Sequence, residues 1–140
     1  MVRLDDRKTD PFKFEKGVRQ GCFISPLLFN VIGEHIMRRV ESNLPERSGK
    51  VIGGRALWNI RYADDTTLIG NKRREMIEMA EQLRQASLYM GLHINSAKTS
   101  AMTVHGVGKV RIQTEEIENV EKFKFLGSYI TPKRRKLDRH

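Results

Sequence analysis

Two stretches of the chain carry apolar residues at three- and four-residue steps, which is the pattern of an amphipathic helix. The first is predicted from Pro26 to about Glu41, with the Ser25 hydroxyl as its N-terminal cap. Gly33 lies inside this helix and lowers its helix propensity slightly. The second is predicted from about Lys72 to Met90, where Gly91 ends it. The apolar positions that we expect on the buried stripe of the first helix are Leu28, Phe29, Ile32, Ile36 and Val40.

Short β-prone runs lie between and after the two helices. Residues 57–62 and 66–69 are separated by a few residues centred on Asp64, and this spacing predicts a hairpin with the acidic residues at its tip. Further strands are predicted at 12–15, 51–52, 92–94, 99–104, 110–113 and 120–125. The pattern favours an α+β fold, in which a short antiparallel sheet packs against two amphipathic helices.

The length and composition favour one domain. The chain has 140 residues and 39% hydrophobic content, enough for a single core, which we expect to occupy residues 1–131. Residues 132–140 form a basic run without apolar periodicity, and we expect them to be a solvated, mobile tail. The 26 Lys and Arg against 17 Asp and Glu give a net charge of +9, which favours nucleic acid as a partner.

The cysteine count and hydropathy bear on location. Cys22 is the only cysteine, so no disulfide can form within the chain, and no apolar run is long enough to span a bilayer. We therefore expect an intracellular protein, cytoplasmic or nuclear and not secreted, with no membrane partner. The histidines show no metal-ligand spacing, and neither a phosphate-binding loop nor a dinucleotide fingerprint is present, which disfavours a zinc site, an ATPase and a Rossmann enzyme.

The adjacent acids Asp64 and Asp65 are the main candidates for chemistry. Neighbouring strand residues point to opposite faces, so two adjacent carboxylates converge only where the chain turns. Converging carboxylates suit Mg²⁺, which typically takes one or two of them and completes its shell with water and phosphate. Two-ion phosphoryl transfer needs further carboxylates, and an isolated Asp-Asp pair is far more often an ordinary turn.

Other motifs accompany this pair in a definite order. Residues 61–66, Arg-Tyr-Ala-Asp-Asp-Thr, resemble the catalytic core motif of reverse transcriptases, particularly those of non-LTR retrotransposons and endonuclease-reverse transcriptases. Residues 17–22 with 25–30 resemble the family's loop-and-helix motif, which lies against the template and incoming nucleotide. Residues 91–99 resemble its helix-to-strand motif, and 123–128 its primer-grip hairpin. The resemblance extends from about Phe12 to Thr131 and implies part of a polymerase palm.

The resemblance also implies roles for single residues. Asp64 would ligate catalytic metal, and Asp65 would complete or support the acidic site. The metal would be Mg²⁺, with Mn²⁺ as an alternative. The residues implied in nucleotide and template binding are Gln20, Gly21, Ser25, Pro26, Tyr62 and Lys98, and those of the primer grip are Leu126 and Gly127. The plainer alternatives are a turn glycine for Gly21 and a solvated surface lysine for Lys98.

The sequence departs from the family pattern upstream. Reverse transcriptases bring a third carboxylate from a strand several tens of residues before the Gln20 motif, and here only nineteen residues precede Gln20. The acids available there are Asp5, Asp6 and Asp10, which a surface turn fits better. Phe23 stands where the family commonly has proline, and its effect stays open.

We therefore expect a fragment of an RNA-directed DNA polymerase, which would act on an RNA template, a DNA primer and deoxynucleotide triphosphates. The fingers, the first palm motif and the thumb would come from a longer polypeptide, and this chain alone should have little activity. The first alternative is a non-catalytic, basic nucleic-acid-binding remnant. The second is an unrelated α+β interaction domain, which would leave the ordered motifs as coincidence.

Overall fold

A computed structural model describes residues 3–4, 7–8, 21–46, 48–104 and 109–131. Several predictions concern residues outside these ranges. They include the strand at 12–15, Gln20, the three acids upstream of it, and the tail at 132–140. The first described pair of strands, β1 (Arg3–Leu4) and β2 (Arg7–Lys8), is antiparallel.

The two predicted helices are present. α1 spans Ile24–Ser42 and α2 spans Arg73–Tyr89, so α2 agrees with its prediction to one residue at each end. The predicted cap of α1 is wrong, because Phe23 holds that position and no side chain caps the helix there. Ser25 and Pro26 are the second and third helical residues. A proline is tolerated in the first turn, where backbone N–H groups have no partner within the helix.

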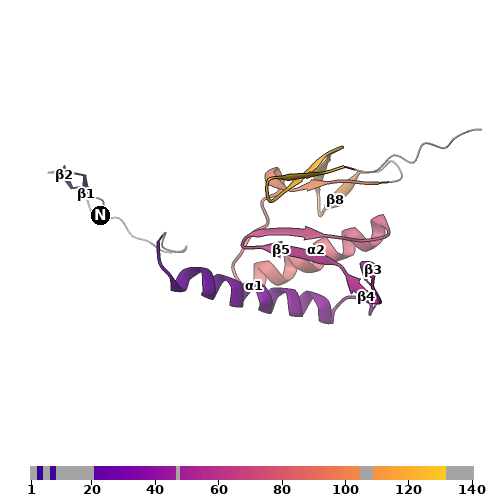
Figure 1. Ribbon diagram of the computed structural model, residues 1–140, viewed down its shortest axis with the longest axis horizontal. Coiled ribbons are helices and arrows are strands. Elements are labelled where there is room, and N and C mark those ends of the chain that lie inside the picture. The colour runs from indigo at the N-terminus through magenta and orange to yellow at the C-terminus, as the bar shows by residue number, and fades with distance from the viewer. Residues whose placement is uncertain (1–2, 5–6, 9–20, 47, 105–108, 132–140) are drawn as a thin grey trace, which may run out of the picture.

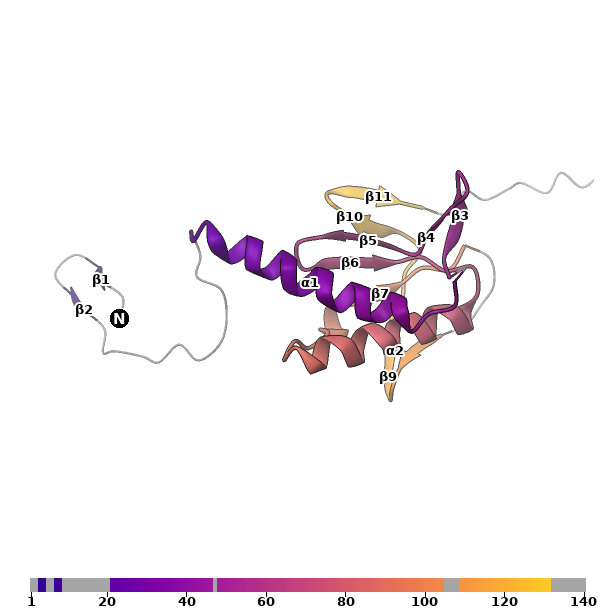
Figure 2. The same ribbon diagram turned by 90° about the horizontal axis from the view of Figure 1, so that it is seen from below.

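The core lies between α1, α2 and the start of the central hairpin. Its side chains with under a tenth of their surface exposed are Ile36, Met37, Val40, Trp58, Met79 and Ala86. Val40 and Met79 are fully buried and hold the two helices together. The predicted buried stripe of α1 is wrong at Leu28, which is 58% exposed, and correct at Ile36 and Val40. Phe29 and Ile32 are half-buried, and Ile32 packs against the core. The first half of α1 extends past the rest of the core (Figure 2).

The strands form hairpins and one small mixed sheet. The hairpins are β3 (Lys50–Ile52) with β4 (Arg55–Leu57), β5 (Asn59–Tyr62) with β6 (Asp65–Leu68), and β10 (Phe123–Phe125) with β11 (Ser128–Ile130). The mixed sheet has the order β7 (Ser100–Ala101), β9 (Glu115–Asn119), β8 (Val110–Ile112), and η1 (Ser96–Lys98) lies against β9. The α+β class is confirmed. A single antiparallel sheet is wrong, because the strands form separate sheets and β7 pairs with β9 in parallel.

Three predicted strands also need correction. Residues 92–94 are irregular because the N–H of Leu92 turns back to the Ser87 carbonyl at 2.9 Å and closes the end of α2. Residues 120–125 are not one strand, since β9 ends at Asn119 and β10 begins at Phe123. The strand predicted at 99–104 is reduced to Ser100–Ala101.

The β5–β6 hairpin lies beside the two helices, and the β10–β11 hairpin lies beyond it, on the side away from α1 (Figures 1 and 2). The turns of these two hairpins point to the same side of the molecule in both views. This arrangement places the predicted acidic tip and the predicted primer-grip turn at one end of the fold.

Candidate catalytic hairpin

The acidic pair lies at the turn of the β5–β6 hairpin. Tyr62 pairs with Asp65 as the last rung of the ladder, so Ala63 and Asp64 alone form the turn. Ala63 has φ +50°, a backbone conformation that non-glycine residues rarely adopt and that recurs at functional sites. Both acids are exposed. Their position at a turn therefore allows the two carboxylates to face solvent together.

The two faces of this hairpin differ in chemistry. Cross-strand partners share a face, so Tyr62 and Asp65 lie on one side, and Arg61 and Thr66 lie on the other. Tyr62 is 63% exposed, whereas Arg61 and Thr66 are partly buried. The exposed face thus presents an aromatic ring and a carboxylate next to the acidic turn.

Arg61 joins the buried face of the hairpin to α1, and the sequence analysis did not anticipate this contact. Its Nη2 donates to Oε2 of Glu34 at 3.1 Å, and the other oxygen, Oε1, accepts a hydrogen bond from Nε of Arg38 at 2.9 Å. The hydrogen bond from Arg38 lowers the pKa of Glu34 most, and the hydrogen bond from Arg61 lowers it further. The sequence shows Arg61 inside a β-prone run and Glu34 inside a predicted helix, but nothing in the sequence indicates that the two side chains meet.

The loop before α1 is described from Gly21 onward, so the predicted position of Gln20 stays untested. Gly21 has φ +80°, which explains glycine there, and a Cβ at this position would meet nothing within 4 Å. The Ser25 hydroxyl hydrogen-bonds Cys22 and, together with the N–H groups of Ile24 and Ser25, lowers the pKa of that thiol. Pro26 is exposed on the first turn of α1.

The other predicted site residues lie on separate elements. Lys98 is exposed at the end of η1, where its backbone N–H donates to Oδ1 of Asn95 at 3.2 Å. Leu126 and Gly127 form the two-residue turn of the β10–β11 hairpin, with φ +48° and +79°. The structure thus brings this turn and the acidic turn to the same side (Figure 1). Lys98 lies on η1, which contacts β9 of the three-stranded sheet.

The acidic turn places two carboxylates next to each other on the surface. Asp64 and Asp65 supply hard oxygen donors, which fit Mg²⁺ when water and phosphate complete the coordination. Within residues 21–46, 48–104 and 109–131, no group of three or more His, Cys, Asp or Glu side chains could hold a metal ion. The described donors therefore suit a weak, open site and not a closed protein cage.

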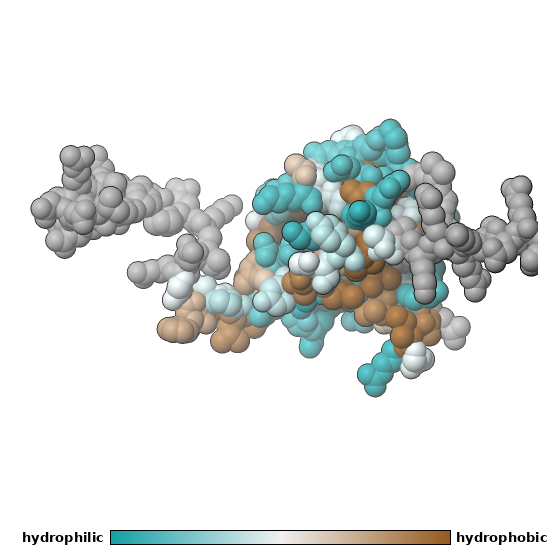
Figure 3. Space-filling view, turned by 45° about the horizontal axis from the view of Figure 1, so that its top comes forward, coloured by the Kyte–Doolittle hydropathy of each residue, from teal (hydrophilic) through white to brown (hydrophobic). Residues whose placement is uncertain are grey.

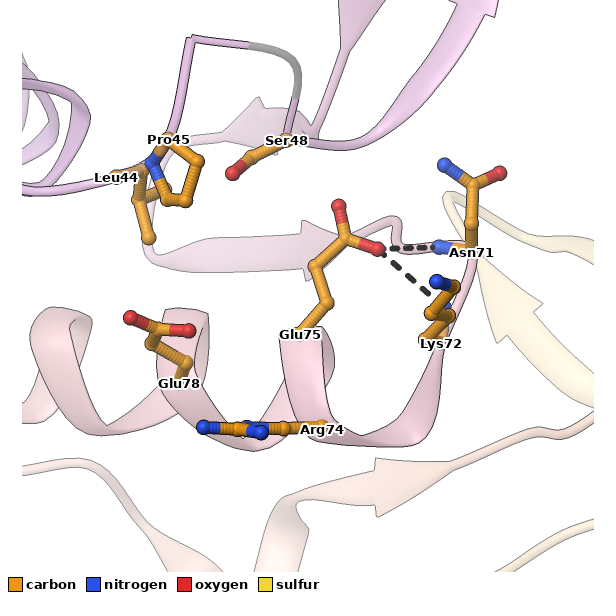
Figure 4. Close-up of a pocket in the computed structure, with 8 residues that line it drawn as sticks. All are labelled: Leu44, Pro45, Ser48, Asn71, Lys72, Arg74, Glu75 and Glu78. Carbon is orange, nitrogen blue, oxygen red and sulfur yellow. Dashed lines mark hydrogen bonds between the residues drawn. The ribbon is translucent and has the colours of Figure 1, made fainter.

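A pocket lies away from the acidic turn, and its carboxylate has a structural role. It has a volume of about 360 Å³ and is lined by Leu44, Pro45, Ser48 and the start of α2. Glu75 points into it and accepts N–H bonds from Gly49 at 2.5 Å, Asn71 at 2.8 Å and Lys72 at 3.3 Å; Figure 4 shows the latter two. Burial raises the pKa of Glu75, but these three bonds together outweigh burial and leave the pKa below its usual value. The carboxylate is thus fully used in holding the loop to the helix.

The family model for reverse transcriptase (RNA-dependent DNA polymerase) matches residues 1–130. The chain therefore belongs to the reverse transcriptase family, and the predicted family is confirmed. The hairpin with the acidic turn and the two packed helices lie within the matched region.

Two relatives come from retrotransposable elements. The Pol polyprotein of the type-1 element R2 of Nasonia vitripennis is 25% identical over 126 residues, which cover 80% of this chain and 12% of the relative. The Pol polyprotein of the type-2 element R2DM of Drosophila melanogaster is 24% identical over 134 residues, covering 96% and 12%. The chain thus spans about an eighth of these relatives.

Neither described helix is long and apolar enough to cross a membrane.

Proposed function

We propose that this chain forms part of the palm of a non-LTR retrotransposon's RNA-directed DNA polymerase and carries its catalytic hairpin. The observation that carries the proposal is the position of Asp64 and Asp65 at an exposed turn between paired strands, in a chain of the reverse transcriptase family. The relationship to R2 Pol polyproteins supports the type of element.

Asp64 and Asp65 would hold Mg²⁺, with Mn²⁺ as an alternative ion. When bound, such an ion offsets the charge that develops on the transferred phosphate and its leaving group. Tyr62, on the same exposed face as Asp65, would support the primer terminus. Gln20, Gly21, Ser25 and Pro26 would border the nucleotide and template, and Lys98 would face the triphosphate. Leu126 and Gly127, whose turn points to the same side as the acids, would grip the primer.

A further carboxylate would have to complete the catalytic site. Two-ion catalysis needs several carboxylates around the ions, and no group of three or more His, Cys, Asp or Glu side chains among the described residues could hold one. We propose that a longer polypeptide supplies the third one, together with the fingers and thumb. The chain alone would then bind template, primer and nucleotide weakly and incorporate little.

Primer extension on an RNA template tests this function. The chain alone should incorporate almost no deoxynucleotide, whereas a polypeptide extended upstream to include an acidic palm strand should incorporate it. Asp64→Asn in the extended form should reduce incorporation by at least about a hundredfold, as losses of key electrostatic groups do. Glu118→Gln, an exposed acid on β9, is the matched control and should leave the rate unchanged. Equal activity of Asp64→Asn and the parent would refute the proposal.

The net charge of +9 favours a second candidate, a non-catalytic nucleic-acid-binding remnant. Its binding would be dominated by phosphates, tolerant of sequence and weakened steeply by salt. Asp64→Asn would then leave binding unchanged, and no extended form would incorporate nucleotide. The extension assay and a salt titration of RNA binding separate the two candidates.

A further inference from the structure

Arg61 is the last inward-facing residue of β5 before the acidic turn. Its side chain is 25% exposed, and Nη2 forms the ion pair with Glu34 on α1. The other terminal nitrogen, Nη1, is buried and has no hydrogen-bond partner among the described residues. Buried N–H groups are nearly always paired, so this exception calls for an explanation. The contact with α1 holds the guanidinium in a position where Nη1 has no hydrogen-bond acceptor among the described residues.

Gly33 provides the room for this contact. A Cβ built on Gly33 would lie 2.8 Å from Nη1 of Arg61, a distance at which one of the two atoms must shift, and at an ordinary contact distance of 3.5 Å from Cζ. Because Nη1 is the end of a flexible side chain, the guanidinium would shift away from an added Cβ, and this shift would disturb the hydrogen bond from Nη2 to Glu34. Glycine is unfavourable inside a helix, so its presence in the middle of α1 is explained by the arginine that lies on it.

The contact therefore fixes the hairpin against the helix close to the proposed metal site. The turn begins two residues after Arg61, and the paired strands transmit any displacement of β5 to it. We propose that Arg61 is a positioning residue: seated over Gly33, it sets where the acidic turn lies relative to α1. This inference rests on the proposed function, in which the turn binds a divalent cation.

Gly33→Ala is the sharpest test, because it changes no residue of the hairpin. The amide resonances of Ala63, Asp64 and Asp65 would be followed by NMR, first alone and then during titration with Mn²⁺, which broadens signals near its binding site. In a helix interior, this substitution would otherwise be favourable. We expect the three resonances to move, and the Mn²⁺ concentration for half-broadening to rise at least about threefold, as when groups that orient metal ligands are lost.

Arg38→Gln is the matched control. Arg38 also binds Glu34, but it is 77% exposed and lies on α1 alone, so its loss should leave the hairpin resonances and Mn²⁺ broadening as in the parent. Arg61→Lys is the second variant, and it keeps the inference testable if Gly33→Ala fails to fold by circular dichroism. It should weaken Mn²⁺ binding in the same direction. Combining Gly33→Ala with Arg61→Lys should add little further, because both disturb one contact.

Unchanged resonances at the turn in Gly33→Ala, or independent effects of the two substitutions, would overturn the inference. If the parent chain itself shows no Mn²⁺ broadening at the turn, the proposed metal site fails, and Arg61 is then judged on the resonances alone. Turn resonances that are displaced in Gly33→Ala but not in Arg38→Gln still support the positioning role of Arg61. Turn resonances that stay unchanged in Gly33→Ala exclude that role.

Discussion

Glu75 shows how a single carboxylate can hold two elements together. It lies in the first turn of α2 and accepts backbone N–H groups from Asn71 and Lys72, just before the helix, and from Gly49, twenty-six residues earlier. An acid in the first turn of a helix also interacts favourably with the helix dipole. The junction between the 43–49 loop and α2 therefore depends on the charge of this residue.

Glu75→Gln should lower the free energy of unfolding at pH 7 by about 1–2 kcal/mol, because hydrogen bonds to a charged acceptor are replaced by weaker ones. The pKa of Glu75 is lowered in the fold, so its contribution is complete above its unfolded value of about 4.3 and is lost as the pH falls through the folded value. Urea unfolding should thus show the gap between parent and variant narrowing below about pH 4. Glu78→Gln, exposed one turn along α2, is the control; an equal loss there would contradict this role.

The candidate site could be predicted at the residue scale only where sequence neighbours determine it. The acids at 64 and 65 stand at a turn because the runs on either side are β-prone, and that much is local. The contact of Arg61 with Gly33 and Glu34 joins residues 28 and 27 positions apart, and it depends on how a hairpin packs on a helix. No local pattern encodes such a pairing.

The same division holds among the elements. Apolar periodicity predicts α1 and α2 because burial against each other stabilises both helices. β9 was missed because its sequence, Glu-Glu-Ile-Glu-Asn, is poor in β-formers, and only Ile117 is buried. This strand forms because β7 and β8 pair with it from both sides. Strand propensity is overridden there by tertiary pairing, which a single sequence does not reveal.

The β5–β6 turn carries strain that its sequence could have avoided. Ala63 has φ +50°, where glycine is normally favoured because it lacks a Cβ. Ala63→Gly should therefore raise the free energy of unfolding by about 0.5 kcal/mol, the relief of strain exceeding the greater freedom of the unfolded chain. Ala56→Gly on β4 is the control and should lower it by about 0.5–1 kcal/mol, because its backbone is ordinary. Chemical denaturation compares them; equal destabilisation would mean that Ala63 is unstrained.

At the scale of the whole molecule, α1 contributes to the core through one half only and leaves apolar side chains exposed on the other half. The buried side chains gather where the second half of α1 meets α2, while the first half of α1 exposes large apolar side chains. These are Ile24, Leu27, Leu28 and Val31, and Phe23 just before the helix is exposed as well. Figure 3 shows apolar surface at the end of the molecule where α1 begins. Apolar patches of this kind favour association with other surfaces.

This uneven surface gives a prediction that separates self-association from folding. Leu27 and Val31 are each 65% exposed one turn apart, so replacing both with lysine removes apolar area without opening the core. The free energy of unfolding should change by less than about 0.5 kcal/mol, as for most surface substitutions. Sedimentation velocity at increasing concentration should show less association than the parent. Ile36→Lys, two turns along the helix and 4% exposed, is the contrasting variant and should unfold the chain, because it buries an unpaired charge. If the lysine pair destabilised the chain as much as Ile36→Lys does, the first half of α1 would have to pack against the chain itself.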